Sequence, residues 1–265
     1  WTLFSMAPLA QTLALLAMAV ATAAITIVPL DIVPRATDKP YCDSNNGVNG
    51  ENKMPQLKHF DFLKNNTFEK VWTNARDEWQ KRGSDSSTLT KDQAMALLVY
   101  TMKSMFSDFN KAVRTAGNSN QEYQDNFYFN TLHFLLTQAL QKLRRPNECL
   151  NVSRGVKDVE FNVKLGDKVH FGEFTSLSLD KTVAQDYGTD TMFKVHTCHG
   201  VDIQKFSFNQ SEKEVLIPPF ETFEVTKFTR EGKKVQIELR STGTFSDDDC
   251  IPLKGGILGT TRGDG

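Results

Sequence analysis

The sequence predicts an α+β fold, with a helical region at about 55–145 followed by a region of strands at about 148–242. Before Pro146, apolar residues recur at spacings of three and four, as they do along one face of a helix. After Pro146, short β-branched and aromatic runs stand between Gly, Asp and Pro, which is typical of strands. A run of helices followed by a run of strands favours an α+β domain over a parallel α/β sheet.

Three apolar stripes predict the helices, and we interpret all three as faces that pack in the core. The first ends before Gly83, and the second begins at Thr90–Gln93, which form a plausible capping box. The third stripe stops before Pro146. The stripes are Phe68, Val71, Trp72, Ala75 and Trp79; Ala94, Leu97, Leu98, Thr101 and Met105; and Leu132, Leu135, Leu136, Ala139, Leu140 and Leu143.

Six runs predict strands, and turn-forming residues bound them. In the last run, Val235, Ile237 and Leu239 alternate with polar residues, as a half-buried strand requires. The six runs are 149–156, 169–179, 191–198, 215–217, 222–228 and 234–240.

The two ends of the chain differ from its middle. Residues 1–24 resemble a secretory signal peptide, because the apolar run 9–20 leads into small residues that a signal peptidase can cut, with Met6 as the natural start. The alternative is a membrane anchor, for which the run is short. We expect the folded domain at 25–251 and a flexible, glycine-rich tail at 252–265, which lacks the apolar segment of a GPI-anchor signal. These features predict a protein of the secretory pathway, extracellular or in a granule lumen, without stable membrane insertion.

Composition excludes some classes of function. Lysine and arginine total 31 against 32 for aspartate and glutamate, so we expect no nucleic-acid partner. No cysteine pair has C-x-x-C spacing, so we expect no metal. In an oxidising compartment four cysteines suggest two disulfides, with three possible connectivities. The cysteines are Cys42, Cys149, Cys198 and Cys250, and the glycosylation sequons stand at Asn65, Asn151 and Asn209.

Two glutamates stand two residues apart beside an apolar run at 215–217. In extended backbone, alternate residues point to the same face, so Glu212 and Glu214 are expected to aim into one site. Taken alone, such a pair is also typical of the solvated end of a strand.

Two further patterns can hold a ligand. Ser176 and Ser178 alternate along one run, which puts two small hydroxyls on one face. Arg154 interrupts an apolar strand, where it is costly to bury unless it is paired. Gly155 beside it permits close approach of a ligand. An anion such as a pyrophosphate would account for both residues.

Together these elements resemble the arginine-specific ecto-ADP-ribosyltransferase family of vertebrates. That family carries an Arg-Gly strand, an F-x-S-x-S strand and an E-x-E strand followed by V-L-I-P-P-F-E, which here are Arg154–Gly155, 174–178 and 212–221. The resemblance extends from about 28 to 250 and is greatest to avian members. It implies a helical region packed on a mixed or antiparallel two-sheet core. It also implies transfer of ADP-ribose from NAD⁺ or NADP⁺ to protein arginines, with release of nicotinamide.

The resemblance also implies roles for single residues. Glu214 would bind the nicotinamide ribose and stabilise the positive charge that forms as the C–N bond breaks. Glu212 would position the target guanidinium and help to remove its proton. Arg154 would hold the dinucleotide, and Ser176 would contact the ribose and orient Glu214. Further residues implied around NAD are Tyr100, Gly155, Glu173 and Ser207, and the implied disulfides are Cys42–Cys250 and Cys149–Cys198.

Three positions depart from the family pattern: Ser153 in place of an aromatic residue, Leu177 in place of a small one, and Glu173 in place of Gln. We therefore retain two alternatives. One is a catalytically weak or inactive binding protein at the surface, and the other is an enzyme that mainly hydrolyses NAD. The expected partners are NAD⁺ and arginine-bearing proteins, and the expected state is a monomer.

Overall fold

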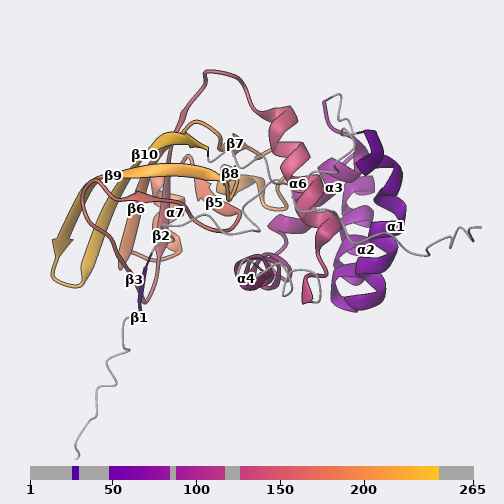
Figure 1. Ribbon diagram of the computed structural model, residues 1–265, viewed down its shortest axis with the longest axis horizontal. Coiled ribbons are helices and arrows are strands. Elements are labelled where there is room, and N and C mark those ends of the chain that lie inside the picture. The colour runs from indigo at the N-terminus through magenta and orange to yellow at the C-terminus, as the bar shows by residue number, and fades with distance from the viewer. Residues whose placement is uncertain (1–25, 30–47, 84–87, 117–125, 245–265) are drawn as a thin grey trace, which may run out of the picture.

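The computed structural model describes residues 26–29, 48–83, 88–116 and 126–244, which form a helical half beside a sheet half (Figure 1). This arrangement agrees with the predicted α+β class. The helical half contains α1 (Val48–Lys64), α2 (Asn66–Lys81), α3 (Lys91–Thr101), α4 (Phe106–Ala116) and α6 (Asn130–Leu143). The sheet half contains β2 (Leu150–Val156), β3 (Val159–Asn162), β4 (Lys168–Val169), β5 (Thr175–Ser178), β6 (Thr191–Thr197), β7 (Val201–Asp202), β8 (Glu214–Ile217), β9 (Glu221–Glu231) and β10 (Lys234–Thr244), with the short helix α7 (Lys181–Asp186) between β5 and β6.

The first apolar stripe forms the buried face of α2, as predicted. The third stripe lies in α6 and all its members but Leu143 are buried, yet residues 131–137 are buried on every side, so the single face predicted for α6 is too narrow. The capping box of α3 is also present, because the Thr90 hydroxyl accepts from the Gln93 amide and the Gln93 side chain accepts from the Thr90 amide. The single apolar face predicted for α3 is wrong. Residues 93–100 are all buried, because α3 packs between α2 and α6 and reaches the sheet half. Met105 lies beyond the end of this helix.

The main sheet is mixed and has eight strands in the order β4-β9-β10-β6-β2-β5-β8-β7. Its pairs are antiparallel except for β10 with β6, which run parallel. A second sheet pairs β1 (Thr26–Pro29) with β3 in parallel. The order places β2, β5 and β8, which carry the Arg-Gly, serine and glutamate motifs, side by side.

The strand predictions fail mainly where the chain turns. The run predicted at 169–179 divides into β4 and β5, and Gly172 between them adopts a φ of 67°. The sequence reading also missed β1, β3 and β7, which are short. The last two strands are longer than predicted, because β9 and β10 form one hairpin whose turn includes Gly232 at a φ of 62°.

Strand β8 lies between two hydrophobic cores. Leu216 belongs to a core that is otherwise mostly helical, whereas Val215 and Ile217 belong to a core within the sheet half. Because side chains alternate along a strand, Glu214 shares the face of Leu216. The sheet therefore presents Glu214 on the side of the helical half.

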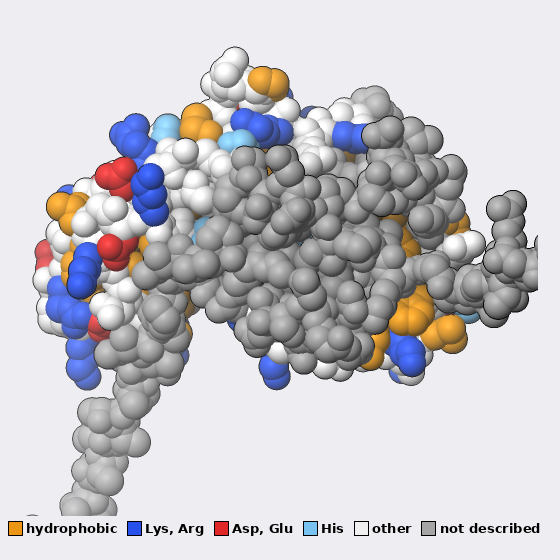
Figure 2. Space-filling model, viewed as in Figure 1, with side chains coloured by type: hydrophobic (Ala, Val, Ile, Leu, Met, Phe, Trp, Pro, Cys, Tyr) orange, Lys and Arg blue, Asp and Glu red, His pale blue; other side chains and the backbone are white. Residues whose placement is uncertain are grey.

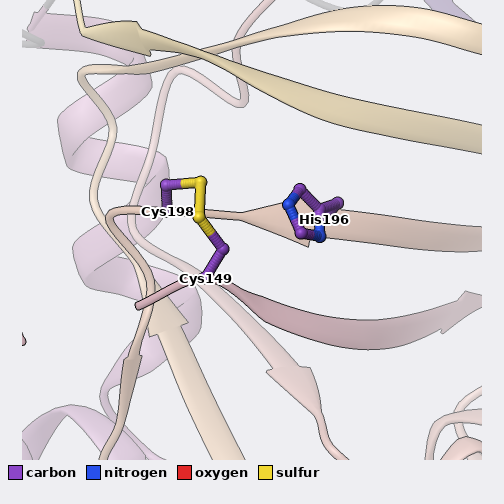
Figure 3. Close-up of side chains that lie close together, drawn as sticks. All are labelled: Cys149, His196 and Cys198. Atoms are coloured by element: carbon purple, nitrogen blue, oxygen red, sulfur yellow. A yellow bond between two sulfur atoms is a disulfide. The ribbon is translucent and has the colours of Figure 1, made fainter. Parts of the chain in front are cut away.

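One disulfide is present among the described residues, between Cys149 and Cys198 with an S–S distance of 2.02 Å (Figure 3). It joins the start of β2 to the end of β6, as the family resemblance implies. The other implied pair, Cys42–Cys250, lies outside the described residues, as do the predicted signal peptide and tail. No helix in the described ranges is both long and apolar enough to cross a membrane.

Candidate active site

Glu214 is the first residue of β8, and its side chain is only 5% exposed. Residues Gln210–Glu212 form a 3-10 turn before it, and Lys213 takes a left-handed conformation with φ 47° and ψ 51°. The prediction that Glu212 and Glu214 share one extended strand is therefore wrong. The two carboxylates nevertheless lie close enough together that the charge of Glu212 helps to raise the pKa of Glu214.

The Glu214 carboxylate is buried but not isolated. Ser207, which is 1% exposed, donates its hydroxyl hydrogen bond to Glu214 Oε2 at 2.8 Å. Burial raises the pKa of Glu214 above its ordinary value, whereas hydrogen bonds from Ser176 and Ser207 and the charge of Arg154 oppose the rise. The structure thus brings four predicted site residues together around one carboxylate.

Arg154 lies in β2 beside the serine strand. Its Nη1 donates to the backbone oxygen of Ser176 at 2.7 Å, and its side chain is only half-buried. A guanidinium carries five N–H donors in a planar fork, which is more than this one bond requires. The same side chain can therefore fix the serine strand and face an anionic ligand.

Gly155 has a packing reason for lacking a side chain. A Cβ built there would lie 2.1 Å from the carbonyl oxygen of Gly188 and 2.2 Å from that of Ala184. The backbone that approaches Gly155 is thus the chain's own, where α7 packs on β2. Contact between Gly155 and NAD stays a prediction.

Tyr100 and Glu173 are both held by partners within the protein. The Tyr100 hydroxyl donates to the Phe174 carbonyl oxygen at 2.8 Å, and the side chain is 2% exposed. The Tyr100 hydroxyl therefore supports the backbone at the start of the serine strand, and its contact with NAD stays a prediction. Glu173 forms an ion pair with Arg114 of α4, which places its carboxylate between the helical half and the serine strand.

The loop at 203–213 carries Ser207 and Glu212, and the sequence reading missed the residues that hold it. Arg82 donates through Nη1 to the Ser207 oxygen at 2.8 Å and through Nη2 to the Phe208 oxygen at 2.9 Å. From the other side, Ser178 donates its hydroxyl to the Glu212 backbone oxygen at 2.7 Å. No local pattern could reveal the Arg82 contacts, because they span 125 and 126 residues.

Tyr187 is a further residue at the site that the motifs did not assign. It follows α7 and is 54% exposed. Partial burial, a hydrogen bond to Glu212 and the charges of Glu212 and Glu214 raise the pKa of Tyr187 to about 12. The phenol therefore stays protonated at neutral pH and acts as a donor beside Glu212.

Among the described residues, one group has the spacing of metal ligands. Ligand atoms of Cys149, His196 and Cys198 lie within 4.8 Å of one another (Figure 3). The two sulfurs are joined in the disulfide, and thiolates rather than disulfides bind metal ions. The expected absence of a metal cofactor stays a prediction.

Comparison with known proteins identifies the class of protein to which this fold and site belong. A solved structure of a mutant of the eukaryotic mono-ADP-ribosyltransferase ART2.2 in complex with NADH superposes with a TM-score of 0.70 and 32% identity, covering 84% of this chain and 97% of that chain. Fold and site together therefore define the mono-ADP-ribosyltransferase class. The family model for NAD:arginine ADP-ribosyltransferase matches residues 30–247. The chain belongs to this family.

Curated relatives agree with the family assignment. NAD(P)(+)–arginine ADP-ribosyltransferase 2 of Gallus gallus is 43% identical over 235 residues, which cover 87% of this chain and 74% of the relative. GPI-linked NAD(P)(+)–arginine ADP-ribosyltransferase 1 of Mus musculus is 38% identical over 241 residues, covering 85% and 74%. The resemblance to avian members is thus confirmed.

Proposed function

We propose that this chain is an enzyme that transfers ADP-ribose from NAD⁺ or NADP⁺ to arginine side chains of proteins and releases nicotinamide. The observation that carries the proposal is the buried Glu214 carboxylate, held by Ser207 with Ser176 and Arg154 beside it. A fixed negative charge in a dry site is what a reaction with a cationic transition state requires. Family membership supports the same substrate pair.

In the first step, the bond between the ribose carbon and the nicotinamide nitrogen breaks, and its electron pair leaves with nicotinamide. The sugar becomes an oxocarbenium ion, which a nearby carboxylate stabilises in glycoside cleavage generally. Glu214 would supply that charge. Its burial makes the attraction stronger than it would be in water. Arg154 would hold the pyrophosphate, because a guanidinium binds phosphate oxygens in a bidentate manner.

In the second step, a guanidinium nitrogen of the acceptor attacks the same ribose carbon. Arginine is a poor nucleophile because it is almost always protonated, so a base must take one proton. Glu212 would take it, since it neighbours Glu214 and its side chain is half-buried. Water in place of the acceptor would give NAD hydrolysis at the same site.

One of the departures from the family pattern, Leu177, lies away from this chemistry. It is 4% exposed and packs in the core within the sheet half, on the opposite side of β5 from Ser176. Ser153, in contrast, pairs with Ser178, which in turn pairs with Glu214, so this small residue lies on the face of the carboxylate. The position of Leu177 therefore supports the enzyme over the inactive binding protein.

We also propose that the protein works as a monomer in or beyond the secretory pathway. The Cys149–Cys198 disulfide supports this, because disulfides persist in oxidising compartments. The names of relatives as GPI-linked or ecto-enzymes support it further. Figure 2 shows acidic and basic side chains interspersed over the sheet half, which agrees with a protein acceptor rather than nucleic acid.

Replacing each glutamate separately tests the proposal. Glu214→Gln keeps the shape but removes the charge, so arginine transfer and NAD hydrolysis should both fall by roughly a hundredfold or more. Glu212→Gln should reduce transfer more than hydrolysis, because its role lies on the acceptor side. Nicotinamide release, with and without the soluble arginine mimic agmatine, measures both activities.

Glu224→Gln serves as the matched control, since this exposed glutamate of β9 should leave both rates unchanged. Near-normal turnover in Glu214→Gln would overturn the assignment of the stabilising carboxylate. Equal losses of both activities in Glu212→Gln would contradict the division of roles.

A further inference from the structure

Asn209 uses both ends of its side-chain amide within the loop that carries the glutamates. Its Oδ1 accepts from the Ser211 backbone nitrogen at 3.3 Å and from the Ser211 hydroxyl at 2.7 Å, which caps the 3-10 turn. Its Nδ2 donates to Glu212 Oε1 at 2.9 Å. The Oδ1 atom thus stabilises the turn, whereas the Nδ2 atom donates a hydrogen bond to Glu212, a carboxylate of the proposed acceptor site.

The backbone of Glu212 does not depend on this contact. Ser178 binds its carbonyl oxygen, and Arg82 binds the loop at Ser207 and Phe208. What the Asn209 amide helps to fix, together with the Tyr187 phenol, is the direction of the Glu212 side chain. An acceptor base gains from such fixing, because a catalytic group must meet its partner in a narrow range of orientations.

The same nitrogen is also the atom to which an N-linked sugar would be attached. Asn209, Gln210 and Ser211 form an N-x-S sequon, and all three residues are exposed. An N-linked glycan replaces one hydrogen of Nδ2, which lies 2.9 Å from Glu212 Oε1. The sugar would therefore stand directly beside the carboxylate that handles the acceptor.

We propose that Asn209 is a positioning residue for Glu212, and that glycosylation of its amide nitrogen closes the site to arginine acceptors, agmatine included. This inference rests on the proposed transferase function. It makes Asn209 a site where the cell can separate arginine transfer from NAD hydrolysis, because Glu214 and its partner Ser207 are not altered.

Two variants of the full chain, made in a bacterial host that attaches no N-glycans, test the positioning role. Asn209→Asp keeps the capping oxygen but exchanges the donor for a second carboxylate. Transfer to agmatine should fall about tenfold, as loss of a charge-assisted hydrogen bond implies, with NAD hydrolysis within about twofold of the original.

Ser211→Ala is the matched control, since it leaves the donating nitrogen in place and should keep transfer within about twofold. An Asn209→Asp variant that transfers as well as the original, or that loses transfer and NAD hydrolysis equally, would overturn the positioning role. If the original protein makes no ADP-ribosyl-agmatine at all, the proposed function fails instead, so the two failures are distinguishable.

The glycan is tested with protein from animal cells. Glycopeptide mass analysis should find a sugar on Asn209, and molecules carrying it should hydrolyse NAD but give at least tenfold less ADP-ribosyl-agmatine. Ser211→Ala from the same cells lacks only this sequon and should retain both activities. An unmodified Asn209, or a form glycosylated there with full transfer activity, would overturn this half of the proposal.

Discussion

At the residue scale, Glu214 meets two opposing demands. Its proposed role needs a charged carboxylate, whereas its burial favours the neutral form and raises its pKa. Ser207 offsets part of this cost with a hydrogen bond at 2.8 Å. Such a conflict between stability and charge is common at functional sites, where perturbed pKa values concentrate.

This conflict predicts how Glu214→Gln changes stability with pH. Because the folded-state pKa of Glu214 is raised, the stability that this group contributes is full below the unfolded pKa and is lost as pH rises through the folded one. The variant removes that loss, so it should be more stable than the original near pH 8, and this advantage should shrink as the pH falls toward about 4. Thermal denaturation across this range measures the difference.

Glu212→Gln provides the comparison, because its side chain is only half-buried and should show no comparable gain. A Glu214→Gln variant that is less stable than the original at high pH would contradict this prediction. It would mean that the partners of the Glu214 carboxylate stabilise its charged form by more than burial destabilises it.

Sequence patterns predicted which motif residues lie together better than they predicted what holds these residues in place. The residues of the motifs, Arg154, Ser176 and Glu214, meet in the structure. Their supports were not predictable from the sequence, because a hydrogen bond such as that of Arg82 to Ser207 depends on tertiary packing. The turn at Glu212 was also missed. Two glutamates separated by one residue suggest a strand, and the sequence does not reveal that the residue between them, Lys213, is left-handed.

At the scale of elements, the loop at 203–213 links the helical half to Glu214, the proposed catalytic carboxylate. Arg82 stands at the end of α2 and holds two carbonyl oxygens of the loop. Thr101, the last residue of α3, accepts from the Phe208 backbone nitrogen at 2.8 Å. The helices therefore help to place Ser207, and through it Glu214.

Arg82→Lys tests this link. A single ammonium cannot reproduce the planar fork that spans two carbonyls, so the loop should loosen. Transfer and hydrolysis should fall together, by about tenfold, because Ser207 orients the carboxylate that serves both. Initial rates with and without agmatine measure the change, and Lys81→Ala, an exposed neighbour on the same helix, is the control. A selective loss of transfer alone would contradict the link.

Only the helix α2 matched its stripe fully, for a physical reason: a helix that buries one face repeats its apolar residues at local spacings. The helices α3 and α6 did not show one face, because both are enclosed on several sides. No stripe had been assigned to α1, α4 or α7. Short strands such as β7, with two residues, carry too few side chains to show a period.

At the scale of the whole molecule, the order of the strands could not be predicted from local sequence patterns. The parallel pairing of β10 with β6 and the central position of β2 both arise from contacts between distant segments. Only the family resemblance anticipated the two-sheet core. Once formed, this order sets three short motifs from distant parts of the chain beside one another, and the site follows from that placement.

The central claim is that this placement transfers ADP-ribose to arginine. The most direct measurement is mass detection of the product after incubation of the folded protein with NAD⁺ and agmatine. The account predicts ADP-ribosyl-agmatine, with released nicotinamide equal to the sum of this product and any free ADP-ribose, and loss of both products in Glu214→Gln. Release of nicotinamide with free ADP-ribose alone, at saturating agmatine, would contradict arginine transfer and identify the site as one of NAD hydrolysis.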